Sequence, residues 1–350
     1  MRKILVLEGD GIGPEIISCA VKIIELIKNK FHLNIELEFD YIGGACIDKY
    51  GVPIRKETIQ KAKKYGIVLL GAVGGYKWDK LPIRPEQGLL TLRKEMGVFA
   101  NLRPIHSFPV YTGPLKNTSQ IDILFLRELT SGIYFGKPKK TKIVNNQKIA
   151  IDTMKYSEKE IERVVDMAFK FSQKRRKFLV SVDKANVLES SKLWREVVNR
   201  KSKEYPDVKV EHHLVDSFAM NLILKPQYFD VVVTENLFGD VLTDEAAVLV
   251  GSLGLLPSAS LSFNRGLYEP IHGSAPDLAG KNIANPIGTI LSVALMFKYS
   301  FNKENIHDLI YNGVFKTMEE GILTFDLSPN KYYSTTEFTE KIIDNIIKLS

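Results

Sequence analysis

The chain has 350 residues, of which 45% are hydrophobic and 25% charged, and its formal net charge is +7. This length predicts about two globular domains with a sizeable core. The lysines lie in dispersed, surface-like stretches such as 61–64 and 137–142, not in a basic block interleaved with aromatic residues. We therefore expect no nucleic-acid partner, and we attribute the charge to an acidic substrate or to composition.

The first apolar run, Ile4–Leu7, is followed almost at once by Glu8 and Asp10. It is too short for a signal peptide or a membrane span, so we expect a buried strand and no membrane partner. The only two cysteines are Cys19, in a helix-like setting, and Cys46, in a loop-like setting. Two cysteines cannot form a disulfide framework, which favours a reducing, cytoplasmic location.

Strand-like and helical segments alternate along the chain. After Ile4–Leu7 come a glycine-rich turn, a helical pattern over 15–30, alternation over 35–41, a helix over 56–65 and the apolar run 67–70. A second set comprises 164–171, 178–182, a helical stretch around 192–201, 208–215, 231–234 and a helix from about 240 to 250. This rhythm predicts an α/β architecture with largely buried strands.

Two turns have a clear local signature. The segments 141–144 and 149–153 flank Asn145-Asn146-Gln147, which predicts a β-hairpin. The segment Gly9–Glu15 resembles a dinucleotide-binding fingerprint but has Pro14 in place of the last glycine. Proline is favourable at the first position of a helix, so we expect only a tight glycine turn that leads into a helix.

A carboxylate pair follows the predicted strand 231–234. Asp240 and Asp244 are four residues apart and share one face of a helix, where two like charges repel unless a cation lies between them. Carboxylate oxygens suit Mg²⁺ or Mn²⁺, although a solvated acidic face is equally compatible with this spacing. Lys184 and Asp216 also follow strands, and a lysine beside a cation is a plausible base; either residue alone is more often a surface ion-pair partner.

Three arginines form a further group: Arg93, Arg103 and Arg127, of which the last two interrupt otherwise apolar or proline-bounded stretches. A buried guanidinium is costly unless it is paired, and its fork matches a carboxylate, so together they could bind a dicarboxylic acid. Each could instead be structural. The segment from Glu269 to Asp277 holds small residues between prolines, as in loops that approach a ligand closely, although a surface turn is the simpler interpretation.

Five ordered segments together carry a family resemblance. They are Gly71–Gly75 with Lys77 and Trp78, Arg127–Thr130 with Gly132–Gly136, Val182–Leu188, Asn236–Glu245 and His272–Asp277. Over almost its whole length the chain resembles the β-decarboxylating dehydrogenases, and within them the isopropylmalate subgroup. The resemblance implies oxidative decarboxylation of 3-isopropylmalate to 2-oxo-4-methylpentanoate and CO₂ with reduction of NAD, a reaction of leucine biosynthesis.

The resemblance also implies a two-domain α/β fold that is not a Rossmann fold and has mixed parallel and antiparallel sheets flanked by helices. One domain, on the cofactor side, would comprise 1–98 and 251–350, and the other 99–250. A homodimer with shared active sites is implied, in which a hairpin arm near 141–153 interlocks the subunits. Lys184 and Asp216 would then reach the partner's site.

Residue roles carry over from the family at matching positions. Tyr134 and Lys184 would be catalytic, as proton donor and base. The metal ligands would be Asp240 and Asp244 with Asp216, which also lies beside the substrate. The substrate's carboxylates would be held by Arg93, Arg103 and Arg127. The cofactor contacts would be Gly75, Glu86, His272, Gly273, Ser274, Ala275, Pro276, Asp277 and Asn285.

Two features separate the subgroup from its relatives. Leu89 and Leu90 would meet an apolar isopropyl branch where an isocitrate enzyme needs a polar group. Asp277 would accept hydrogen bonds from the adenosine ribose and repel a 2′-phosphate, which favours NAD over NADP. The sequence departs from the family pattern at Tyr76, usually proline, at Ser131, usually glycine, and in the segment 111–119.

Two alternatives stay open from the sequence. The first is a sister enzyme that acts on malate, tartrate or homoisocitrate, against which the two leucines argue. The second, of a different class, is a catalytically idle basic binding protein on the same scaffold, which only the high pI suggests.

Overall fold

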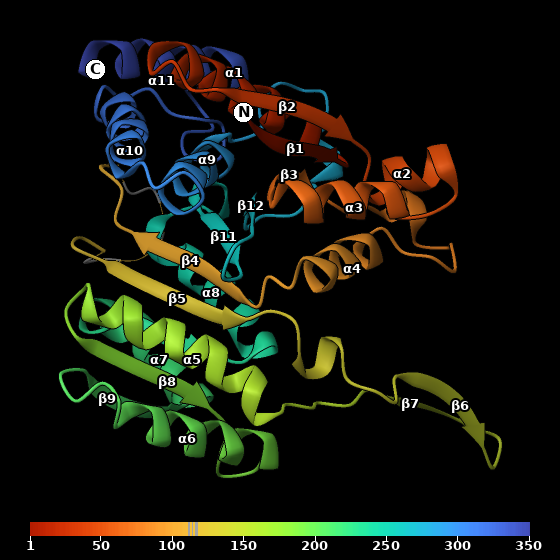
Figure 1. The fold of residues 1–350 in the computed structure, drawn as a ribbon. Helices are drawn as coiled ribbons and strands as arrows, with labels where there is room; N and C mark the ends of the chain where they lie inside the picture. Colours follow the sequence, from red (N-terminus) through yellow and green to blue (C-terminus); the bar gives the residue numbers. More distant parts are fainter. Residues whose placement is uncertain (111–112, 114, 116–117) are drawn as a thin grey trace. The chain divides into compact units, whose positions relative to one another are not determined.

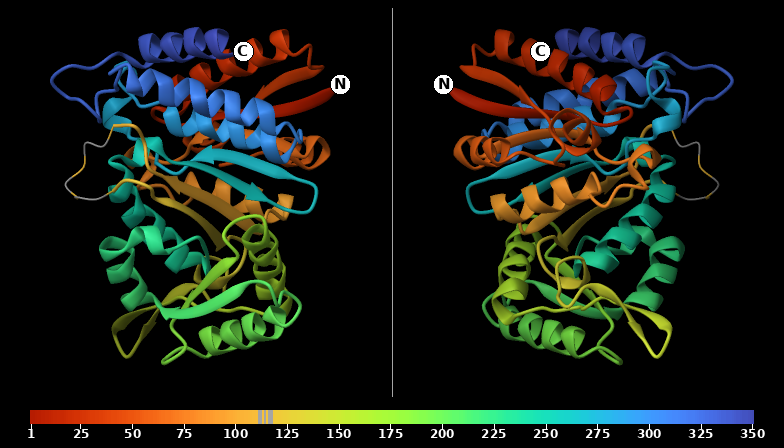
Figure 2. Two further views of the ribbon diagram at one scale, coloured as in Figure 1. Left: turned by 90° about the vertical axis from the view of Figure 1, so that its left-hand side faces the viewer. Right: turned by 90° about the vertical axis from the view of Figure 1, so that its right-hand side faces the viewer.

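The computed structural model describes residues 1–110, 113, 115 and 118–350, so the segment 111–119 lies largely outside the described residues. The chain divides into two compact units. Unit 1 comprises Met1–Val98, Ser107–Ser119 and Val250–Ser350, and unit 2 comprises Phe99–His106 and Gln120–Leu249. Each unit has its own strands and its own covering helices (Figures 1 and 2).

Among its described residues, unit 1 contains five strands in the order β2-β1-β3-β12-β11. Neighbouring strands are parallel except for β11 and β12, which are antiparallel. Their bounds are β1 Arg2–Gly9, β2 Ile35–Asp40, β3 Ile67–Ala72, β11 Pro257–Leu261 and β12 Gly266–Pro270. β3 is buried over its whole length, which explains its purely apolar sequence from Ile67 to Leu70.

The helices of unit 1 form two groups. The first group contacts the sheet through α1 and α9, on which α10 and α11 pack. In the second group, α3 contacts β1 and β3, α2 contacts β1, and α4 packs against both helices. Their bounds are α1 Gly13–Lys30, α2 Gly43–Tyr50, α3 Lys56–Tyr65, α4 Glu86–Met96, α9 Ile287–Tyr299, α10 Glu304–Glu319 and α11 Thr335–Leu349.

The sheet strands of unit 2 run in the order β4-β5-β10-β8-β9 and are parallel except for the antiparallel pair of β4 and β5. Their bounds are β4 Ala100–His106, β5 Asp122–Glu128, β8 Phe178–Asp183, β9 Lys209–Leu214 and β10 Val231–Thr234. In Figure 1, α5 lies in front of these strands, and α7 lies behind them. The helices are α5 Glu158–Gln173, α6 Glu189–Ser202, α7 Val215–Leu224 and α8 Asn236–Val250. The predicted α/β fold with mixed sheets is confirmed.

A two-stranded hairpin projects from unit 2 (Figure 1). β6 (Lys140–Val144) pairs with β7 (Gln147–Ile151), and nearly every residue of both strands is exposed. The turn residues Asn145 and Asn146 have φ values of 48° and 60°, a conformation that asparagine tolerates better than most residues. The hairpin predicted from the sequence is therefore present.

Two local expectations were wrong. Cys46 lies in helix α2, not in a loop, because Gly43 and Gly44 at the start of this helix obscure its helical pattern. A side chain at Gly44 would collide with the ring of Trp78, so close packing requires this glycine. Helix α8 begins at Asn236, four residues before the expected start at Asp240. Within the described part of the chain, no helix combines the length and apolar character needed to cross a bilayer.

Candidate active site

The candidate site in unit 2 lies where its strands end. The parallel strands β5, β10, β8 and β9 bring their carboxyl ends to one edge of the sheet. Arg127 lies at the end of β5, Asp240 and Asp244 in α8 after β10, Lys184 just after β8, and Asp216 just after β9. Ligands bind at this edge in open α/β sheets, so the topology brings these residues to the place where a site is expected.

Arg127 is a buried cation whose three side-chain nitrogens each have an acceptor. Its side chain is 2% exposed. Nε and Nη2 donate to Oδ1 of Asn236 at 3.0 and 2.7 Å, and Nη1 donates to Oδ1 of Asp240. A side chain at Gly239 would collide with the stem of Arg127, which explains the glycine in this turn of α8. A guanidinium so fixed keeps its charge in one position.

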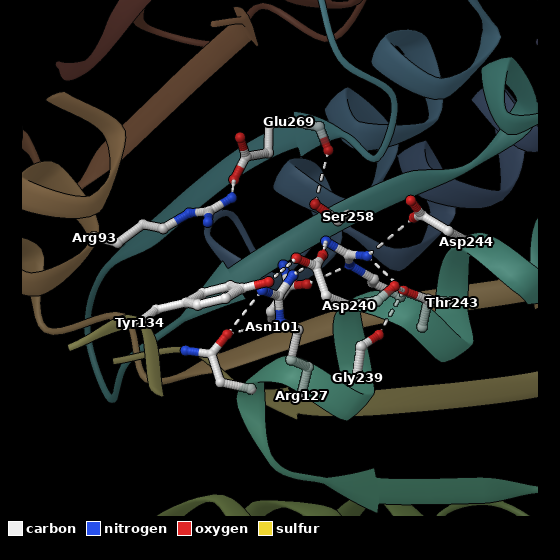
Figure 3. Close-up of polar contacts among 12 residues, drawn as sticks. Arg93, Asn101, Arg127, Tyr134, Gly239, Asp240, Thr243, Asp244, Ser258 and Glu269 are labelled. Atoms are coloured by element: carbon white, nitrogen blue, oxygen red, sulfur yellow. Dashed lines mark hydrogen bonds and ion pairs between the residues drawn. The ribbon is translucent and has the colours of Figure 1, made fainter. Parts of the chain in front are cut away.

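Arg103 reaches the same carboxylate from the neighbouring strand β4. Its Nε donates to Oδ1 of Asn101 at 2.7 Å, and its Nη1 donates to the hydroxyl of Thr243. Nη2 lies 3.4 Å from Oδ1 of Asp240, and Nη1 lies 3.8 Å from Oδ1 of Asp244. Two arginines and two aspartates therefore form one charged cluster, of which Figure 3 labels Arg127, Asp240 and Asp244.

The aspartate pair of α8 is not simply a solvated acidic face. Asp240 is paired with both arginines, whereas Asp244 is 60% exposed and has only the longer contact to Arg103. Burial raises the pKa of the Asp244 carboxyl; Arg103 opposes this shift, and the neighbouring charge of Asp240 adds to it. A divalent cation would relieve this repulsion, and carboxylate oxygens are its preferred ligands. This pair of donors fits such a cation.

Tyr134 donates from its hydroxyl to Oδ2 of Asp240 at 2.8 Å. It lies in a short 3₁₀ helix, Gly132–Tyr134, that follows β5. Burial and the bond to Asp240 raise the pKa of Tyr134 to about 12, although Arg127 and Arg103 act in the opposite direction. The phenol therefore keeps its proton near neutral pH and can serve as a proton donor.

Lys184 and Asp216 form an ion pair at 2.9 Å. The hydrogen bond from Lys184 is the main reason why the pKa of Asp216 lies below its usual value. Among the described residues, no three His, Cys, Asp or Glu side chains converge into a metal-binding group. The chain thus joins the predicted base to one predicted metal ligand, but it does not group Asp216 with Asp240 and Asp244.

The loops predicted to bind the cofactor meet at one edge of unit 1. They follow the carboxyl ends of β3 and β12, and the glycine turn after the parallel strand β1 lies at the same edge. A side chain at Gly11 would lie 2.0 Å from the carbonyl oxygen of Ser274, and Ile12 N donates to that oxygen at 2.8 Å. The glycine turn after β1 therefore supports the His272–Asp277 loop by close backbone contact.

The His272–Asp277 loop contains strained and unsatisfied groups. Ala275 has a φ of 36°, a left-handed conformation that alanine rarely adopts. Nδ1 of His272 bonds to Gly273 O at 2.9 Å, while its buried Nε2 has no partner among the described atoms. Burial lowers the pKa of His272, which favours a neutral ring. Such features are common where a loop is shaped for a ligand.

Tyr76 and Asp277 interact across two of these loops. A hydrogen bond with Asp277 is the main reason why the pKa of the Tyr76 phenol is raised. Tyr76 is one of the positions at which the sequence departs from the family pattern. The departure therefore adds a polar contact to the aspartate expected to bind the ribose.

The remaining predicted residues of unit 1 have protein partners or lie in α4. Arg93 pairs with Glu269 at 2.6 Å (Figure 3). The amide of Asn285 donates to Asp326 at 3.0 Å, and its oxygen accepts from Ile287 N at 2.9 Å, so it has a structural role in this conformation. Leu89 and Leu90 are half-buried, and the Glu86 carboxylate lies close to Gly74.

Sequence reasoning missed several residues that position the site. They are Asn101 and Asn236, which hold the two arginines, Thr243, which accepts from Arg103, and Asp10. The Asp10 carboxylate accepts from the backbone N–H groups of Gly44, Ala45 and Gly74 at 2.7–2.9 Å. Asn236 was visible two residues after the predicted strand 231–234, but nothing in the sequence linked it to Arg127, 109 residues earlier.

Comparison with known proteins gives a consistent result. The family model described as isocitrate/isopropylmalate dehydrogenase matches residues 3–342. The 3-isopropylmalate dehydrogenase of Aquifex aeolicus is 50% identical over 358 aligned positions, which cover 99% of this chain and 98% of that protein. The protein of the same name from Pseudomonas fluorescens Pf-5 is 52% identical, with 93% of each chain covered.

Solved structures agree in fold. Isocitrate dehydrogenase from Methylococcus capsulatus has a TM-score of 0.89 at 33% identity, with 99% of each chain covered. A β-decarboxylating dehydrogenase from Thermococcus kodakarensis has a TM-score of 0.82 at 34% identity, covering 100% of this chain and 97% of that one. The chain belongs to the isocitrate/isopropylmalate dehydrogenase family, as its motifs predicted.

Proposed function

We propose that this protein catalyses the oxidative decarboxylation of 3-isopropylmalate to 2-oxo-4-methylpentanoate and CO₂, with reduction of NAD, in leucine biosynthesis. The observation that carries the proposal is the partly buried cluster of Arg103, Arg127, Tyr134 and Asp240 in a chain about half identical to named 3-isopropylmalate dehydrogenases. The cluster joins fixed positive charge, a proton donor and a carboxylate in one place, which is what a negatively charged hydroxy acid requires.

The two buried arginines bind and orient the substrate. Their guanidinium groups are held by the neutral side chains of Asn101, Asn236 and Thr243 as well as by Asp240, so they are already oriented before a ligand arrives. A carboxylate substrate would share these donors without a reorganisation of the strands. Arg93, held by Glu269, is the further proposed carboxylate ligand.

Two groups of this chain handle protons. Lys184, in its neutral amine form, would accept the proton of the substrate's 2-hydroxyl, and its contact with Asp216 holds Nζ at one position. Tyr134 would deliver the proton that completes the product at the carbon left by CO₂. Its pKa of about 12 keeps that proton on the oxygen, and the bond to Asp240 orients the hydroxyl.

A divalent cation and a nicotinamide cofactor complete the proposal. Asp240 and Asp244 would hold Mg²⁺ or Mn²⁺ with Asp216 of a second subunit, and the bound metal supplies Lewis-acid polarisation of the 2-oxo group. Gly75, Glu86 and the His272–Asp277 loop would hold NAD, which supplies the hydride acceptor. We assign NAD rather than NADP because Asp277 would repel a 2′-phosphate.

We also propose a homodimer with shared sites. Met220 and Leu224 of α7 are 58% and 70% exposed, and Val241 of α8 is 61% exposed. A second subunit would cover these exposed apolar side chains. Lys184→Ala chains and Arg93→Ala chains, each inactive alone, should regain part of the activity when mixed. Mixing either variant with itself is the control, and demonstrated exchange without recovery would contradict shared sites.

The test of the reaction is NADH formation from 3-isopropylmalate with Mg²⁺. It should be repeated with NADP, with a chelator, and with isocitrate, malate, tartrate or homoisocitrate as substrate. We expect strong activity only with 3-isopropylmalate, NAD and metal together. Activity on another acid would reject the role of Leu89 and Leu90 but keep the chemistry. No activity from a folded dimer would reject the proposed function.

A further inference from the structure

Unit 1 has a cavity at the edge opposite the proposed cofactor loops. The parallel strands β1, β3 and β12 begin at Arg2, Ile67 and Gly266, and the cavity lies around these amino ends. Its volume is about 780 Å³, within the range of small-ligand sites. The proposed reaction uses none of the side chains that line it.

The lining is rich in cations. Arg2, Lys3, Lys64 and Arg265 line the cavity, and no aspartate or glutamate is among its described lining residues. Lys3 is already paired with Glu36 at 2.8 Å and Glu38 at 3.7 Å. The other three form no ion pair with any described residue. Three uncompensated charges around one hollow favour an anionic ligand.

The positions of two of these cations are set by neutral groups. Arg2 donates to the carbonyl oxygen of Ser300 and lies over the ring of Phe301, with 5.3 Å from its Cζ to the ring centroid. Arg265 donates from Nη1 to Met96 O at 3.2 Å. Contacts of this kind orient a guanidinium without neutralising it, so its charge is available to a ligand.

Aromatic rings stand among the cations. Tyr65, Phe263, Tyr268 and Tyr299 line the cavity. Phe263 is 84% exposed in the turn between β11 and β12, which is closed by a bond from Ser262 N to Arg265 O at 2.9 Å. An exposed aromatic ring beside free cations offers a stacking surface next to a binding site for negative charge.

We propose that this cavity binds a small organic anion that carries a flat ring, of the nucleoside diphosphate class. Its phosphates would be bound by Arg2, Lys64 and Arg265, and its base would stack on Phe263. Inorganic phosphate would use only the cations and would leave the aromatic surface uncovered. This inference is independent of the proposed reaction, because the cavity and the cofactor loops lie at opposite ends of the same strands.

The test is calorimetric titration of the full-length protein with GDP in saturating NAD, so that the cofactor loops are already filled. We expect one GDP per chain, with affinity at least about tenfold weaker in Lys64→Glu/Arg265→Glu. Lys331→Glu/Lys348→Glu makes the same charge change on exposed residues of the same unit away from the cavity, and it should bind GDP as the unmodified chain does.

A second variant separates the two halves of the ligand. Phe263→Ser replaces an exposed side chain and should weaken GDP binding severalfold while leaving pyrophosphate binding unchanged. The inference would be overturned by no GDP binding to the unmodified chain, or by equal loss in both double variants. Pyrophosphate binding as tight as that of GDP would refute a ligand with a flat ring.

Discussion

Replacing Glu235 by glutamine should stabilise unit 2 at alkaline pH. Glu235 follows β10 and is 3% exposed, and its Oε1 has no hydrogen-bond partner among the described atoms. Burial, with a smaller contribution from the charge of Asp183, raises the pKa of the Glu235 carboxyl from 4.5 to about 8. The Asp183 carboxylate accepts from Arg195 at 2.8 and 2.9 Å.

The magnitude follows from proton linkage. Between the unfolded-state pKa of 4.5 and the folded-state pKa of about 8, the folded chain holds one more proton at Glu235 than the unfolded chain. The free energy of unfolding therefore falls by about 1.4 kcal/mol for each pH unit in this interval. From about pH 5.5 to 8.5 the loss is about 3 kcal/mol, and glutamine, which does not ionise, avoids it.

The assay is urea unfolding at both pH values, followed by tryptophan fluorescence. The chain has two tryptophans, Trp78 in unit 1 and Trp194 in unit 2, so a Trp78→Phe background makes Trp194 report unit 2 alone. The quantity to compare is the difference in unfolding free energy between Glu235→Gln and its parent. Between about pH 5.5 and 8.5, the unfolding free energy of Glu235→Gln should rise by about 3 kcal/mol relative to that of its parent. A difference that does not change with pH would refute the argument.

Four substitutions test the proposed site. Arg127→Lys should lower kcat/KM by about 100-fold or more, because a lysine cannot form both bonds to Asn236 and the bond to Asp240; unchanged kinetics would contradict a substrate role. Tyr134→Phe should lower kcat by about 100-fold with little change in KM, measured in steady state. Asp244→Asn should raise the Mg²⁺ concentration for half-maximal activity by about tenfold or more, and an unchanged metal requirement would exclude Asp244 as a ligand. Tyr76→Phe should weaken NAD binding by about 0.5–1 kcal/mol in calorimetry, and equal binding would show that its hydroxyl does not help to position Asp277.

Patterns among neighbouring residues were enough to predict many of the strands, helices and turns of the fold. The apolar run at Ile67–Leu70, the helix over 56–65 and the hairpin turn at Asn145-Asn146 each depend on neighbouring residues, through burial pattern, helical spacing and backbone preference. Errors occurred where a distant contact overrode the local pattern. The two glycines of α2 look like a loop in the sequence, whereas in the fold the ring of Trp78, 34 residues further along the chain, packs against Gly44.

The family of the protein could also be read from the sequence, because its motifs are ordered and specific. The ion pairs and pKa values of the site residues could not be read from the sequence. Spacing alone left Asp240 and Asp244 as either a solvated face or a cation site, and only the folded sheet brings Arg103 and Arg127 onto Asp240. Burial likewise sets the pKa of Tyr134 and of Glu235, since the cost of desolvating a charge depends on atoms that are remote in the sequence and adjacent only in the fold.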